Sequence, residues 1–192
     1  MWAEVIGLPG VGKTTLIQNN LESISKHFEI IESKRSGFLQ KLYARFLYYF
    51  RIAPGMQDKK LARKLSYRLS FRWFKSAQAH LFFFDSGVAQ LVLENLIETD
   101  FANKAKKLEI LQRFKRPDIL IVVGDKPDNV IQRELMRSDR RFDCDEATLA
   151  ALYKKAEEVL ESDFKPLFTQ VHIVKPGEDQ RFKDIITNAQ SH

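Results

Sequence analysis

The chain has 192 residues, of which 44% are hydrophobic and 29% are charged. This length suits one domain with a single sizeable core and gives no reason to expect a second domain. The formal net charge of +6 would suit nucleic acid or a membrane surface, but anionic nucleotide substrates attract the same basic residues, so charge alone excludes none of these partners. The single cysteine, Cys144, excludes an internal disulfide and a cysteine metal cluster.

Three features of the sequence predict a cytoplasmic protein. No apolar run approaches the ~20 residues that a membrane span needs. The first predicted strand begins too close to Met1 to leave room for a signal peptide. The lone cysteine fits a reducing compartment.

The first predicted elements are a strand over residues 3–6 and a helix from residue 15. Residues 7–14 between them read G-L-P-G-V-G-K-T, which fits the phosphate-binding P-loop pattern G-x-x-x-x-G-K-[ST] at every fixed position. Such a loop presents backbone N–H groups to an anion at a helix N-terminus, and its glycines let the backbone close around a phosphate. A glycine-rich turn with a surface lysine is the alternative, but it does not account for the flanking strand and helix.

The P-loop predicts ATP and Mg²⁺ as the cofactors. Lys13 is expected to neutralise the β- and γ-phosphates, and the Thr14 hydroxyl to ligate magnesium. The predicted nucleotide-binding residues of this region are Gly7, Pro9, Gly10, Val11, Gly12, Lys13, Thr14 and Thr15.

Further short apolar runs predict four more strands, with helical stretches between them. These strands are expected over residues 27–32, 80–85, 118–123 and 171–174. The alternation predicts a three-layer α/β/α fold around a buried, mostly parallel five-stranded sheet.

Two amphipathic helices are predicted between the second and third strands, over residues 38–51 and 58–78, with a turn at 53–55. They form a helical insertion at about residues 33–79. The insertion is rich in aromatic and basic residues, and core packing is the ordinary explanation of its aromatic stripe.

Asp85 ends the third predicted strand, at the edge of the sheet where ligands gather. It can hold magnesium or accept a proton from the attacking group, and the alternative is an N-cap for the helix from Val88. Glu32, at the end of the second strand, is the other candidate base. An exposed loop carboxylate is the competing interpretation of Glu32.

The fourth strand leads into residues 122–128, V-V-G-D-K-P-D, which superficially resemble the guanine-reading N-K-x-D motif of GTPases. A GTPase would also carry D-x-x-G after its third strand, but the third residue after Asp85 is Val88. The fourth strand is instead followed by Arg133 and Arg137, whose spacing places both on one helix face. A solvated basic helix is the alternative.

In their order along most of the chain, these motifs resemble the P-loop nucleoside and nucleotide kinases, especially thymidylate-kinase-like members. The resemblance implies one kinase-like domain over residues 1–192 with a lid at about 137–145. It also implies that Arg133, Arg137 and Arg141 stabilise the transferring phosphoryl group. Pro176 and Gly177 follow the last strand and would border the adenine, although a plain turn is an equally good interpretation.

The implied function is ATP- and Mg²⁺-dependent phosphoryl transfer to a small-molecule acceptor, such as a nucleoside, a nucleotide or a sugar-like compound. Many family members have Asp-Arg after the third strand, whereas this chain has Asp85-Ser86, so the identity of the acceptor stays open. A regulatory P-loop ATPase or GTPase without an acceptor is the alternative function. A nucleic-acid module would use the basic helices, but no sequence-specific recognition motif is present.

Overall fold

In the part of the chain that the structure describes, five strands form one sheet in the order β2-β3-β1-β4-β5, with parallel neighbouring pairs. The strands are β1 (Trp2–Gly7), β2 (Glu29–Ile31), β3 (Phe82–Phe84), β4 (Ile119–Val123) and β5 (Gln170–Val174). The computed structural model describes residues 1–31, 38–56, 58–75, 81–85, 87–113, 117–138, 142 and 144–189. The predicted parallel five-stranded sheet is confirmed.

The central strands β1, β3 and β4 are buried along their whole length. Valine, isoleucine and phenylalanine dominate β3 and β4, as expected for strands covered on both faces. The Phe83 ring makes edge contacts with Phe28 and Phe182, each with ring centroids 6.2 Å apart. These contacts join the sheet to the segment before β2 and to the last helix.

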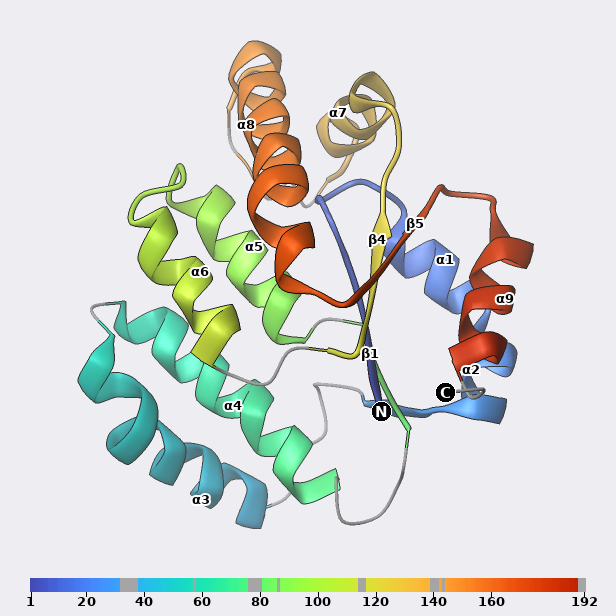
Figure 1. The fold of residues 1–192 in the computed structure, drawn as a ribbon. Coiled ribbons are helices and arrows are strands. Elements are labelled where there is room, and N and C mark those ends of the chain that lie inside the picture. The colour runs from blue at the N-terminus through green and yellow to red at the C-terminus, as the bar shows by residue number, and fades with distance from the viewer. Residues whose placement is uncertain are drawn as a thin grey trace.

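Helices cover both faces of the sheet, which gives the predicted three layers (Figure 1). On one side lie α1 (Lys13–Asn19), α2 (Leu21–His27) and α9 (Asp179–Asn188). On the other lie α4 (Lys59–Lys75), α5 (Val88–Glu98), α6 (Lys104–Arg113) and α8 (Glu146–Val159). The short α7 (Pro127–Leu135) packs against α8 beyond the end of the sheet. Among the described residues, no helix is both long and apolar enough to cross a membrane.

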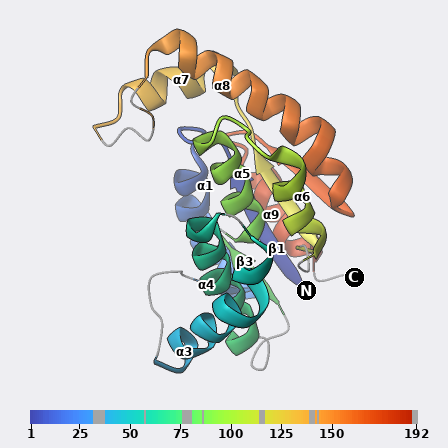
Figure 2. The ribbon, with the colours of Figure 1, turned by 90° about the vertical axis from the view of Figure 1, so that its left-hand side faces the viewer.

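The helical insertion forms an arm beside the sheet. Its first helix, α3 (Phe38–Leu47), packs on α4 and lies on the outer side of that helix (Figure 2). The chain then continues as a π-helical turn, η1 (Tyr48–Ile52), and a 3-10 turn, η2 (Ala53–Gly55). The two predicted helices and the turn between them are therefore present, although the first helix widens into π geometry in its last turn.

The segment after α8 repeats this pattern of a widened helix end. A π-helical turn, η3 (Leu160–Phe164), is followed by a 3-10 turn, η4 (Lys165–Leu167), before β5 begins. Phe164 is fully buried and its ring stacks on that of Phe168 at 6.4 Å. This contact anchors the connection that returns the chain to the edge of the sheet.

Candidate nucleotide-binding and acceptor site

The predicted P-loop connects the end of β1 to the start of α1. Gly10 and Gly12 have positive φ angles of 78° and 91°, which side chains other than glycine rarely adopt. Gly12 is the N-cap of α1, so the backbone turns into the helix where a phosphate is expected. A Cβ atom on Gly10 would lie 2.9 Å from the carbonyl oxygen of Val130, so α7 packs directly against the loop at this position.

Lys13 is the first residue of α1, and its Nζ donates a hydrogen bond of 3.1 Å to the Gly7 carbonyl. The side chain therefore folds back across the loop. Thr14 and Thr15 follow in the first turn of α1 and are exposed. The predicted nucleotide-binding residues of the loop thus lie together, and their individual roles remain predictions.

Two buried side chains that sequence analysis missed hold the P-loop backbone. The Gln90 amide on α5 accepts from the Gly7 N–H at 2.9 Å and donates to the Gly7 carbonyl at 3.2 Å. The hydroxyl of Tyr153 on α8 donates to the Pro9 carbonyl at 2.9 Å. The sequence offers one signal for Gln90, which is a polar residue in a mostly apolar helix. It could not identify the partner, because Gly7 lies 83 positions away along the chain.

Arg133 lies beside the P-loop, and its predicted role in phosphoryl transfer remains a prediction. Its guanidinium donates to the Gly10 carbonyl at 3.1 Å and forms an ion pair with Asp125. Burial raises the pKa of Asp125, but hydrogen bonds from the Lys126 N–H, Arg133 and Asn129 outweigh it and hold the pKa below its ordinary value. Arg133 therefore stabilises the loop by hydrogen bonding and also places a positive charge beside it.

The expectation that Arg137 shares a helix face with Arg133 is wrong, because α7 ends at Leu135. The Arg137 N–H bonds to the Glu134 carbonyl at 3.3 Å, the i→i+3 pattern of a closing turn. The Arg137 guanidinium lies 3.6 Å from the carboxylate of Glu134, a buried residue of α7. Arg141 lies outside the described residues.

The described residues of the predicted lid pack near the P-loop. Phe142 makes an edge contact with Tyr153, whose hydroxyl holds Pro9. Asp145 caps α8, since its carboxylate accepts from the Thr148 N–H at 2.8 Å. These contacts place the segment beside the loop, and its function as a lid remains a prediction.

Asp85 directly follows β3 and is exposed. Phe84, the last residue of β3, pairs with Glu4 of β1, and β1 runs on to Gly7 where the P-loop begins. Asp85 therefore lies at the same edge of the sheet as the P-loop. The N-cap of α5 is Gly87, so the alternative in which Asp85 is the N-cap of this helix is wrong. Glu32 lies outside the described residues.

A buried carboxylate stands at the start of α5, and it belongs to Glu4 of β1. Its Oε1 accepts from the Gln90 N–H at 2.8 Å. Burial raises the pKa of Glu4 from 4.5 to about 7, although backbone hydrogen bonds at Gln90, Ala89 and Gly87 and the charge of Arg68 oppose this shift. A Cβ atom on Gly87 would lie 2.5 Å from the carboxyl carbon, so glycine is needed for this close approach.

The loop after β5 also reaches the P-loop. A Cβ atom built on Gly12 would lie 3.4 Å from the Cγ of Pro176. Gly177 follows with a φ angle of 87°. Pro176 is thus placed beside the loop, and its contact with adenine remains a prediction.

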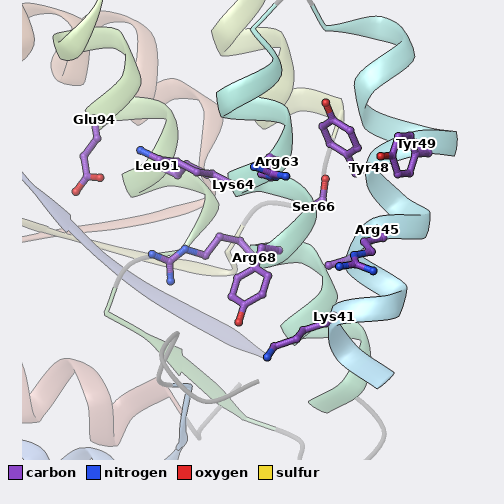
Figure 3. A pocket seen from close by; sticks show the side chains of 12 residues that line it. Lys41, Arg45, Tyr48, Tyr49, Arg63, Lys64, Ser66, Arg68, Leu91 and Glu94 are labelled. Atoms are coloured by element: carbon purple, nitrogen blue, oxygen red, sulfur yellow. The ribbon is translucent and has the colours of Figure 1, made fainter. Parts of the chain in front are cut away.

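A cavity of about 610 Å³ opens between α3, α4 and α5 (Figure 3). Arg68 extends from α4 toward the side where α5 carries Glu94, and Lys41 and Arg45 come from α3. Among the described residues, five basic side chains and one carboxylate line the cavity: Lys41, Arg45, Arg63, Lys64, Arg68 and Glu94. Tyrosines from η1 and α4 supply aromatic surface: Tyr48, Tyr49 and Tyr67.

The cavity connects with the P-loop through shared residues. A second cavity of about 250 Å³ is lined by Lys64 and Glu94 together with Pro9 and Phe142. Gln90, which bonds to Gly7, also donates to the Glu94 carboxylate at 2.9 Å. A continuous polar path therefore runs from the cavity wall to the start of the loop.

No protein-family model and no curated protein matches the chain. Its structure is similar to that of deoxyadenosine kinase from M. mycoides with bound dATP, with a TM-score of 0.61 and 16% identity over 100% of both chains. It is also similar to thymidylate kinase from Candida albicans, with a TM-score of 0.55 and 17% identity over 98% of this chain and 92% of that one. The fold is thus that of the P-loop nucleoside and nucleotide kinases, as the motifs had indicated.

Proposed function

We propose that this protein is a P-loop kinase that transfers the γ-phosphoryl group of ATP to a small-molecule acceptor bound between α3, α4 and α5. One observation carries the proposal: the P-loop adjoins a large cavity lined by cations, and the hydrogen-bonded side chains of Gln90 and Glu94 connect the two. The 610 Å³ cavity has a volume typical of small-molecule sites, which suits an acceptor bound in addition to the nucleotide.

In the proposed reaction the acceptor oxygen attacks the γ-phosphorus while the bond from that phosphorus to the β–γ bridging oxygen breaks. ADP leaves, and the acceptor proton goes to Asp85 or, in the other assignment, to Glu32. The backbone of the P-loop and Lys13 hold the phosphates, and Arg133, Arg137 and Arg141 offset the charge of the transferring group. Catalysis of this kind is mostly positioning and electrostatic stabilisation.

The residues at the edge of the sheet fit a magnesium ion. Mg²⁺ prefers oxygen ligands and is usually held by one or two protein groups together with substrate phosphates. Thr14 and Asp85 are both exposed there and supply a hydroxyl and a carboxylate. When bound, the ion would neutralise charge on the phosphate oxygens.

The acceptor is proposed to be a nucleoside or a nucleotide, because the similar solved structures are a deoxyadenosine kinase and a thymidylate kinase. Aromatic surface from Tyr48, Tyr49 and Tyr67 suits a base, and the cations suit a phosphate. A sugar-like acceptor belongs to the same proposal. We also propose that residues 1–192 form one domain, with an acceptor-binding arm and a lid. Its proposed location is the cytoplasm.

The decisive experiment incubates the purified protein with ATP, Mg²⁺ and panels of nucleosides, nucleoside monophosphates and sugars, and measures product masses. The expected result is one acceptor class that gains the mass of a phosphoryl group in step with ADP formation. Lys13→Ala serves as the inactive control. Release of inorganic phosphate with no phosphorylated product in any panel would favour the alternative, a regulatory ATPase or GTPase.

A further inference from the structure

The arm formed by α3 and η1 exposes a row of large apolar side chains. In the described part of the chain, six of the nine exposed large hydrophobic residues lie between positions 38 and 50. Phe38 and Phe50 are 79% and 71% exposed. The row, called the apolar ridge below, consists of Phe38, Leu39, Leu42, Phe46, Tyr49 and Phe50.

These side chains share one face of the helix. Within α3, the ridge residues Phe38, Leu39, Leu42 and Phe46 span an arc of about 100° at about 100° per residue. Phe50 follows four residues after Phe46, in the π-helical turn η1. The Phe46 and Phe50 rings lie 5.0 Å apart, so the ridge continues from α3 into η1. An exposed apolar patch of this kind marks an interaction surface.

The other faces of α3 pack against the protein or line the cavity. Gln40, Ala44 and Leu47 are buried. Lys41 and Arg45 stand on the side of α3 that lines the cavity. The ridge is therefore separate from the packing face of the arm and is flanked by basic side chains. It meets the cavity lining at Tyr49, which belongs to both.

Charge identifies the kind of partner. Residues 38–56 contain no Asp or Glu, and residues 38–75 hold ten Lys and Arg against the single carboxylate of Asp58, a net charge of +9. The whole chain carries only +6. Two copies stacked through the ridge would bring like charges together without a facing carboxylate, which disfavours self-association. An anionic partner fits both the ridge and its charges.

We propose that α3 and η1 bind in the plane of an anionic lipid bilayer, with the apolar ridge among the headgroups and upper acyl chains. Interfacial helices have this build, with Phe and Leu on one face and Lys or Arg beside them. Tyr49 belongs to the type of aromatic residue that concentrates at membrane interfaces. The binding is peripheral and does not depend on the proposed kinase activity.

The test measures flotation of the full chain with vesicles of phosphatidylcholine alone and of phosphatidylcholine with phosphatidylglycerol. We expect binding that rises with the anionic lipid and falls as salt is added, because surface charges are screened over about 10 Å at 0.1 M salt. Replacement of three ridge residues, Leu42→Ser, Phe46→Ser and Phe50→Ser together, should lower binding at least about tenfold. Arg51→Gln, which lines neither the cavity nor the P-loop, should lower binding roughly fivefold.

The matched control replaces the three exposed apolar residues that lie elsewhere, Leu21→Ser, Met136→Ser and Ile173→Ser, and should bind vesicles like the parent. Circular dichroism and thermal unfolding of each variant establish that it is folded. No anionic-lipid binding by the parent would overturn the proposal, and so would equal loss of binding in the control. A concentration-dependent dimer in the absence of lipid, abolished by the ridge variant, together with unchanged vesicle binding, would assign the ridge to a second copy of the chain.

Discussion

The P-loop and the helical arm hold their parts of the site in different ways. Buried or half-buried side chains from three separate helices, Gln90, Tyr153 and Arg133, hydrogen-bond the backbone of the loop. The cavity beside the arm is lined mainly by long basic side chains, several of which are exposed, such as Arg63 and Lys64. The fixed backbone of the P-loop suits the phosphates, which every nucleoside triphosphate has. The side chains that line the cavity can differ between proteins that bind different acceptors. The comparison predicts that substitutions in the two regions affect different measured quantities.

The largest effect is expected at Asp85, which lies at the same edge of the sheet as the P-loop. Asp85→Asn keeps the shape of the side chain and removes its charge, so turnover should fall about 10²–10⁴-fold while ATP affinity changes little. Steady-state kinetics and calorimetry with a non-hydrolysable ATP analogue separate the two quantities. Asp184→Asn, on the exposed surface of α9, is the control. Normal turnover of the Asp85→Asn enzyme would remove Asp85 from the reaction.

Lys13→Ala should weaken nucleotide binding by about 1.5–3 kcal/mol, because one charge-assisted set of phosphate contacts is lost. The protein should remain folded, since the Lys13 side chain is only half-buried and packs on the loop that it serves. Calorimetric titration with ATP measures the change. Lys26→Ala, which removes an exposed lysine paired with Glu22, should bind ATP normally. Equal affinities of the Lys13 variant and the parent would contradict the P-loop assignment.

Glu4 should make stability depend on pH. Its pKa is raised to about 7 in the folded state and returns to near 4.5 on unfolding, so the folded state binds more protons between these values. The stabilising contribution of protonated Glu4 is complete below pH about 4.5 and is lost as the pH rises through about 7. Relative to the parent, Glu4→Gln should gain roughly 1–3 kcal/mol in unfolding free energy over this window.

Urea unfolding of Glu4→Gln and of the parent between pH 5 and pH 8 measures how the difference in their unfolding free energies changes with pH. A constant difference between the two proteins would not affect this change. Glu22→Gln is the control, since the Glu22 carboxylate is exposed and its pKa is lowered by Lys26. Parallel curves for parent and Glu4→Gln would show that the buried carboxylate titrates normally.

The smallest effect is expected in the arm. Arg63→Gln should raise the KM for the acceptor about tenfold, through one lost charged contact, and leave ATP affinity unchanged. Lys60→Gln, on the same helix but outside the cavity lining, should leave both constants unchanged. If Arg63→Gln weakens ATP binding instead, the cavity belongs to the nucleotide and the proposed division of the site fails.

Local sequence patterns predicted most of the framework. The P-loop stands between a strand and a helix, and each strand was placed with its ends within three residues of those observed. A helix bearing Arg133 and Arg137 was predicted after the fourth strand, and the observed helix, α7, contains Arg133 but ends before Arg137. Spacing alone placed Arg137 on the same helix as Arg133, whereas the chain closes a turn at Glu134 and leaves the helix.

Local patterns in the sequence suffice to predict the P-loop and the layered fold. The glycines of the loop, the short apolar strand runs and the helical periodicity each act between near neighbours. Which polar groups contact each other depends on the packing of segments that are distant in the sequence. The bond from Gly7 to Gln90 spans 83 positions, and that from Tyr153 to Pro9 spans 144. The strand order β2-β3-β1-β4-β5 places β1 at the centre, so its carboxylate, Glu4, stands at the start of α5. Such pairings depend on how distant segments pack, which no short stretch of sequence encodes.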